Sequence, residues 1–71
     1  MRSETRASRL VYLRELFLGN PRGFTARELS DLTGVHIRTI QRDLTLLGTE
    51  LGVALSQEGR RYRAINATTL G

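Results

Sequence analysis

Arginine side chains carry most of the chemistry that this sequence offers. Its 71 residues contain eleven cationic side chains, every one of them Arg, against seven carboxylates, which gives a formal net charge of +4. The planar fork of a guanidinium donates two hydrogen bonds at once, and this suits phosphate oxygens and the O6 and N7 atoms of guanine. Genome composition is the alternative explanation, because the codons for Arg are GC-rich and those for Lys are not.

The arginines gather near the two ends of the chain. Residues 1–15 hold four Arg and two Glu, and residues 58–63 hold three Arg and one Glu, so both segments are basic. The sequence predicts phosphate contacts from Arg2, Arg6 and Arg9 in the first segment and from Arg60, Arg61 and Arg63 in the second. The alternatives are solvated arginines in the first segment and, in the second, a charged edge strand that discourages aggregation.

Other side chains offer little for catalysis or metal binding. The chain has no Cys and one His, so it can form no disulfide and assemble no tetrahedral set of metal ligands. Its carboxylates are scattered, without a nucleophile and a base at a recognisable spacing. We therefore expect no enzyme activity, no metal, no cofactor and no site for a small-molecule effector.

The length and the hydropathy pattern limit the class of protein. A chain of 71 residues forms one domain with a small core. Met1 is followed by RSETRASR, and no later apolar run reaches the length of a signal peptide or a membrane span. Together with the lack of Cys, this predicts a cytoplasmic protein.

The arginines must be positioned by helices, and the first predicted helix covers Ser3–Leu18. Its apolar residues fall on one broad arc at 100° per residue: Ala7, Leu10, Val11, Leu13, Phe17 and Leu18. Arg14 projects within this arc, so we expect it to snorkel or to pair with a carboxylate. The segment Gly19–Gly23 contains Asn and Pro and should end the helix.

A capping box predicts the start of a second helix. Thr25 and Glu28 have the T-x-x-E spacing in which each side chain satisfies the other residue's backbone N–H. The helix should cover 26–33, with Phe24 as a hydrophobic staple in front of it. Its buried side is predicted to consist of Ala26, Leu29 and Leu32. Gly34 should then make the turn in the left-handed region, with Val35 filling the corner.

A longer helical stripe follows that turn. Apolar residues recur at i, i+4, i+7 and i+11 from Ile40: Ile40, Leu44, Leu47 and Leu51, with Ile37 beside them. The predicted third helix covers 37–51 and ends at Gly52, although an earlier end at Gly48 is an alternative.

Two short strands, Val53–Leu55 and Tyr62–Ile65, should follow and form a β-hairpin wing around a turn at 56–60. Tyr62 and Leu55 should anchor that hairpin inward. The expected fold is mainly α with a two-stranded hairpin in residues 1–66, and residues 67–71 form a flexible tail.

The polar side of the third helix is the candidate binding surface. Arg38, Arg42 and Thr45 project opposite Ile40, and Gln41 lies at the flank. His36 and Thr39 lie at the helix N-terminus, where free N–H groups favour phosphate, and His36 is expected to be a weak N-cap. This surface after the Gly34 turn predicts a helix-turn-helix whose second helix enters the DNA major groove. The alternative is a three-helix bundle with a solvated outer face.

The string Leu32-x-Gly34-Val35-x-x-Arg38-Thr39-Ile40-Gln41-Arg42-Asp43-Leu44-x-x-Leu47 resembles the winged helix-turn-helix of bacterial DeoR-type and WYL-associated transcription regulators. The resemblance covers roughly residues 6–65. It implies that Arg38 contacts bases or phosphate, that Arg42 and Thr39 contact the backbone, and that Asp43 orients a neighbouring Arg.

The chain departs from the family pattern at three places. The usual Ser at the cap is His36, the usual basic residue after it is Ile37, and the Gly-rich wing keeps only Gly59. Such regulators also continue into a ligand-sensing or oligomerising domain. The chain is therefore expected to be either a fragment of a regulator or a stand-alone DNA binder.

The function predicted from the sequence is sequence-specific binding of double-stranded DNA, as a bacterial transcription regulator or its N-terminal DNA-binding domain. Such a protein is expected to be associated with the nucleoid. A homodimer is a further hypothesis, because the core is small and such domains often bind paired half-sites. The alternative is a winged-helix module for protein interaction or dimerisation without DNA readout, for which exposed Leu46 and Leu70 would be the first evidence.

Overall fold

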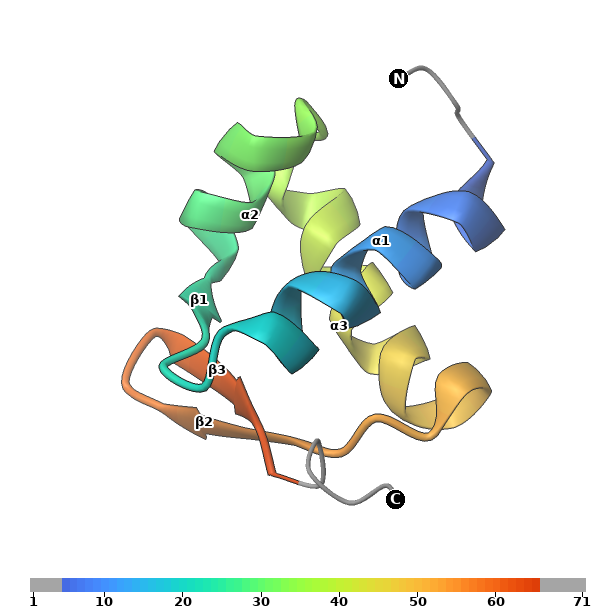
Figure 1. The fold of residues 1–71 in the computed structure, drawn as a ribbon. Coiled ribbons are helices and arrows are strands. Elements are labelled where there is room, and N and C mark those ends of the chain that lie inside the picture. Colours follow the sequence, from blue (N-terminus) through green and yellow to red (C-terminus); the bar gives the residue numbers. More distant parts are fainter. Residues whose placement is uncertain (1–4, 66–71) are drawn as a thin grey trace.

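Three helices and a small antiparallel sheet make up the protein in a computed structural model, which describes residues 5–65 (Figure 1). The helices and strands follow the order α1 (Arg6–Gly19), β1 (Phe24–Thr25), α2 (Ala26–Thr33), α3 (Ile37–Leu51), β2 (Leu55–Glu58) and β3 (Arg61–Ala64). The fold is therefore mainly helical, as predicted. The predicted tail, residues 67–71, lies outside the described residues.

Helix α1 begins three residues later than predicted, because Thr5 is its N-cap. The Thr5 hydroxyl accepts a hydrogen bond from the N–H of Ser8 at 3.1 Å. The buried side of α1 consists of Leu10, Leu13 and Phe17, with Leu16 packed partly against the core.

The predicted apolar arc of α1 was too wide. Ala7 is exposed, and Val11 and Leu18 are 47% and 39% exposed. The two other helices and the sheet cover one side of α1, and these three residues lie outside the covered side. Arg14 pairs with the carboxylate of Glu15 at 3.7 Å, in agreement with the pairing alternative.

Helix α2 starts at the predicted capping box. Thr25 Oγ1 accepts the N–H of Glu28, and Glu28 Oε1 accepts the N–H of Thr25, both at 3.0 Å. Leu29 is fully buried, but Leu32 is 51% exposed, so its predicted burial was wrong. Gly34 ends the helix with φ 75°, the left-handed conformation expected there.

Helix α3 covers Ile37–Leu51, as predicted, and continues through Gly48. Gly52 ends it with φ 67°. Ile40, Leu44 and Leu47 form the buried stripe. Leu51 is 37% exposed, so the buried stripe ends one turn before the helix does.

The sheet has three strands in the order β1-β3-β2, where the sequence predicted a two-stranded hairpin. The additional strand is β1, in which Phe24 and Thr25 pair with Tyr62 and Arg61 of β3. The sequence of a two-residue segment does not indicate that it pairs with a strand some 40 positions away. The sequence therefore predicts only a hydrophobic staple at Phe24 and an N-cap at Thr25. The hairpin strands are also shifted, because Glu58 pairs with Arg61 across a loop of two residues.

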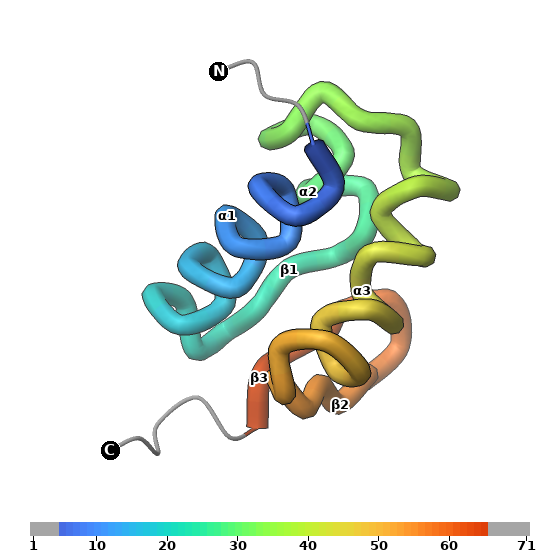
Figure 2. The backbone as a smooth tube through the Cα atoms, turned by 90° about the vertical axis from the view of Figure 1, so that its right-hand side faces the viewer, coloured from blue at the N-terminus to red at the C-terminus, as the bar shows by residue number. Residues whose placement is uncertain are grey.

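The core lies where the three helices and the sheet meet, and both views show β2 and β3 beside the C-terminal end of α3 (Figures 1 and 2). Nine buried apolar side chains form it: Leu10, Leu13, Phe17, Ala26, Leu29, Ile40, Leu44, Leu47 and Val53. Leu55 and Tyr62 pack against this cluster from the sheet, as predicted for the inward anchors. Phe24 meets Phe17 edge to face, with ring centroids 5.5 Å apart. Within residues 5–65, no other element covers the face of α3 that is turned away from this core.

Candidate functional site

The outward face of α3 presents four long or polar side chains in two successive turns. Arg38, Gln41, Arg42 and Thr45 are all exposed. On the opposite side of the same helix, Ile40 and Leu47 are fully buried and Leu44 is 5% exposed. The orientation of α3 is therefore fixed by burial of its apolar stripe, and both guanidinium groups lie on the solvent side, as the helical projection predicted.

The N-terminus of α3 follows the Gly34 turn and is capped by His36. His36 Nδ1 accepts the N–H of Arg38 at 3.2 Å, which confirms its role as N-cap. Thr39 is half-buried in the first turn of the helix. Ser30 Oγ donates to the carbonyl oxygen of Val35 at 2.6 Å and ties the turn back to α2. The positive end of the helix dipole therefore lies beside Arg38 on an exposed corner.

One acidic residue of α3 points inward. Asp43 is 1% exposed, and its carboxylate accepts two hydrogen bonds from Arg9 of α1. Arg9 Nε lies 2.5 Å from Oδ2, and Nη2 lies 3.2 Å from Oδ1. The carboxylate that the family resemblance expected to orient an arginine therefore binds one that is 34 positions away in the sequence. Arg9, a predicted phosphate contact, is instead bound to Asp43, and Arg2 lies outside the described residues.

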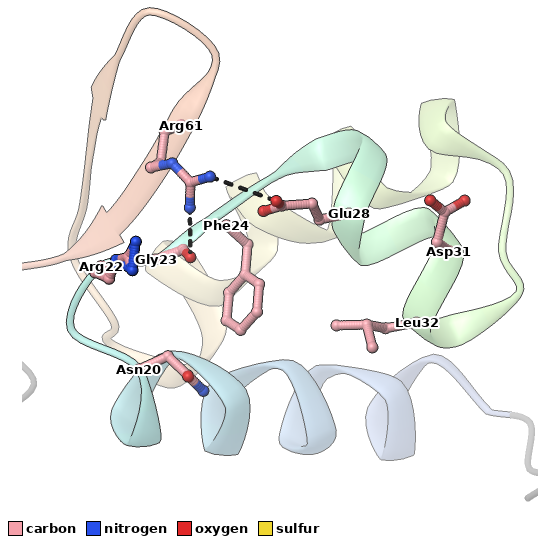
Figure 3. A pocket seen from close by; sticks show the side chains of 8 residues that line it. All are labelled: Asn20, Arg22, Gly23, Phe24, Glu28, Asp31, Leu32 and Arg61. Carbon is pink, nitrogen blue, oxygen red and sulfur yellow. Dashed lines mark hydrogen bonds and ion pairs between the residues drawn. The ribbon is translucent and has the colours of Figure 1, made fainter.

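The arginines predicted for the hairpin separate into two groups. Arg60 and Arg63 are exposed, and so is Arg6 on α1. The guanidinium of Arg61 instead binds within the protein, because Nη1 donates to the carbonyl oxygen of Gly23 at 2.9 Å and Nη2 lies 3.4 Å from Glu28 Oε2 (Figure 3). Arg61 thus joins β3 to the loop before β1 and to α2.

A shallow pocket lies beside this contact, between the end of α1 and the outer side of α2 (Figure 3). Eight residues line it: Asn20, Arg22, Gly23, Phe24, Glu28, Asp31, Leu32 and Arg61. The Thr25 N–H and, more weakly, the Arg61 guanidinium hold the pKa of Glu28 below its ordinary value. With two carboxylates and two guanidinium groups around it, the pocket has no net preference for an anion or a cation.

Two features of the site were missed from the sequence. The Arg9–Asp43 pair had a signal, because Asp43 projects only 60° from Ile40 on the helical wheel and is a charged residue beside the buried stripe. No signal in the sequence indicated that Arg61 binds within the protein, because this contact depends on where the fold places Gly23. Leu46 is half-buried and packs against the core, so its predicted exposure was wrong, and Leu70 lies outside the described residues.

Comparisons of the chain with protein-family models, with curated proteins and with solved structures gave no match. Within residues 5–65, no group of three or more His, Cys, Asp or Glu side chains is arranged to hold a metal ion. None of the helices in that range is long and apolar enough to cross a membrane.

Proposed function

We propose that the chain binds double-stranded DNA sequence-specifically, as a bacterial transcription regulator or its DNA-binding part. In this proposal α2 and α3 form a helix-turn-helix, the β2–β3 hairpin is the wing, and α3 enters the major groove. The observation that carries it is the exposed face of α3, where Arg38, Gln41, Arg42 and Thr45 point away from the core and no other element in residues 5–65 covers them.

The dimensions of α3 support this docking. A helix of 15 residues is about 22 Å long, and its diameter with side chains, about 10–12 Å, matches the width of the major groove, about 12 Å. Side chains in the first two turns then lie deepest in the groove. Arg38 is assigned to guanine and Gln41 to adenine, since these pairs match in donor and acceptor pattern.

Phosphate contacts are assigned to Arg42 and Thr39 of α3 and to arginines of other elements. Arg42 lies one turn beyond Arg38, and Thr39 lies in the first turn, where the helix dipole attracts anions. Arg60 and Arg63 on the hairpin and Arg6 on α1 add positive charge. Arg61 is omitted from this set because its guanidinium already binds Gly23 and Glu28.

Selection of bound fragments from random DNA, followed by anisotropy titrations at several salt concentrations, tests the proposal. Arg38→Ala should lower affinity for the selected sequence and reduce its preference over a scrambled duplex by about 5–100-fold. Arg42→Ala should weaken binding to both duplexes equally and reduce the slope of log K against log salt by about 0.9.

Arg14→Ala is the matched control, because it removes the same charge from α1, where Arg14 pairs with Glu15. It should leave sequence preference unchanged. If the wild-type chain selects no sequence, or if Arg38→Ala and Arg42→Ala bind as tightly as it does, the proposed function is wrong.

A further inference from the structure

Asp43 is the one buried charged residue among residues 5–65, and it lies in the helix assigned to DNA. Removing a carboxylate from water is unfavourable unless it is paired and hydrogen-bonded. Arg9 supplies that partner from α1, with two donors aimed at the two carboxylate oxygens. The side chain of Arg9 is itself only 22% exposed, so the pair lies at the edge of the contact between α1 and α3.

The pair restrains α3 in a way that the apolar stripe does not. Burial of Ile40, Leu44 and Leu47 is non-directional and tolerates small rotations and shifts of the helix. A two-pronged guanidinium–carboxylate contact has a fixed distance and plane, and so it resists both movements.

Asp43 is also close to the residues assigned to DNA. Thr39 precedes Asp43 by one turn on the same side of α3, and Arg42 is its neighbour in the chain. A rotation of α3 by about 10° moves groups about 6 Å from the helix axis by about 1 Å. Hydrogen bonds to base edges are lost over displacements of that size. A small change in the Arg9–Asp43 contact would therefore displace the side chains that are assigned to bases.

We infer that Arg9 and Asp43 are positioning residues that set the rotation of α3 on α1, and with it the direction of the arginines on its outer face. The inference rests on the proposed function and deepens it. It assigns to Arg9 a role in sequence preference without contact to DNA, in contrast to the exposed arginines, which are assigned to direct contacts with bases or phosphate.

Four variants test this inference, one of them Arg9→Gln combined with Asp43→Asn, with Arg14→Gln as the control for loss of one positive charge on α1. Arg9→Gln and Asp43→Asn each break the charged pair. The double variant Arg9→Met with Asp43→Leu replaces it by apolar groups, and such replacements of buried ion pairs commonly keep or raise stability. The double variant thus separates folding from positioning. Each chain is measured for urea unfolding, for affinity toward selected and scrambled duplexes, and for salt dependence.

We expect the preference for the selected duplex to fall about tenfold in Arg9→Gln and in the apolar double variant, while the double variant stays folded. The salt slope should remain that of the wild type in both. Asp43→Asn should lose preference to a similar extent, and combining it with Arg9→Gln should add little, because the two residues act as one unit. Arg14→Gln should keep the preference.

Two results would overturn the inference and leave the proposed function standing. A salt slope lowered by about 0.9 in Arg9→Gln, with normal preference in Asp43→Asn, would make Arg9 a phosphate contact. Full sequence preference in the apolar double variant would make the pair purely structural. A wild-type chain that binds no duplex would refute the proposed function itself, before any variant is compared, and this inference with it.

Discussion

Gly23 lies where the loop before β1 packs closely against β3, and this packing requires a glycine. It is buried and has φ 76°, and a Cβ atom built on it would lie 1.8 Å from the carbonyl oxygen of Tyr62. Both the backbone conformation and the close approach of β3 therefore require glycine. Its own carbonyl oxygen accepts the hydrogen bond from Arg61. The approach of Tyr62 excludes a side chain from Gly23, and the separate hydrogen bond to the Gly23 carbonyl oxygen keeps Arg61 away from the predicted phosphate-binding set.

Gly23→Ala should accordingly lower the free energy of unfolding by about 3–5 kcal/mol, because β1 and β3 must separate to admit the methyl group. Urea unfolding measures this loss. Gly19→Ala is the matched control, since a Cβ atom there meets nothing within 4 Å, and it should change stability by less than about 1 kcal/mol. Equal stability of the two variants would contradict the assigned role of Gly23.

Glu28 makes the stability of the folded protein depend on pH. The N–H of Thr25 and the guanidinium of Arg61 favour the ionised carboxylate, so its pKa lies below the ordinary value of 4.5. A lowered pKa means that this stabilisation is fully present above pH 4.5 and is lost as the pH falls through the folded-state pKa. The wild type should therefore lose stability on acidification more steeply than Glu28→Gln. Parallel unfolding curves on both sides of pH 4.5 would contradict this.

At the scale of elements, α2 shows why an eight-residue helix buries less than its pattern suggests. Only Ala26 and Leu29 are buried, while Leu32, three residues after Leu29, is half-exposed at the rim of the pocket. Leu29→Ala should lower the free energy of unfolding by about 2–5 kcal/mol because it leaves a cavity in the core. Leu32→Ala should change it by less than about 1 kcal/mol. Similar losses in the two variants, measured in urea, would show that Leu32 is buried in solution.

At the scale of the whole molecule, size limits how copies could share DNA. The longest dimension is 30 Å, and half-sites one helical turn apart are separated by about 34–36 Å. Under the proposed function, two copies of this size could therefore lie side by side on a palindrome, each with its own α3 in the groove. We predict that sedimentation will find two chains on a palindromic duplex made from the selected sequence. A single bound chain at saturating protein would rule out the paired arrangement.

Several features could be predicted from the sequence because they depend on neighbours within four residues. The capping box of Thr25 and Glu28, the left-handed Gly34 and Gly52, and the bounds of α3 all arise from local hydrogen bonds and from backbone preferences. The exposed arginines of α3 follow as well, since a strong apolar stripe fixes which side of a helix faces the core.

Other features could be determined only from the tertiary structure, because they depend on residues that are distant in the chain. Pairing of Phe24 with Tyr62, capture of Arg61 by Gly23, exposure of Leu32 and burial of Asp43 against Arg9 are set by where the elements meet. The sequence by itself determined which helices form and which of their residues can face outward, because those choices are local. That Arg9 and Arg61 bind within the protein was decided only by packing, because a guanidinium is held wherever the fold brings a carbonyl or carboxylate oxygen within reach.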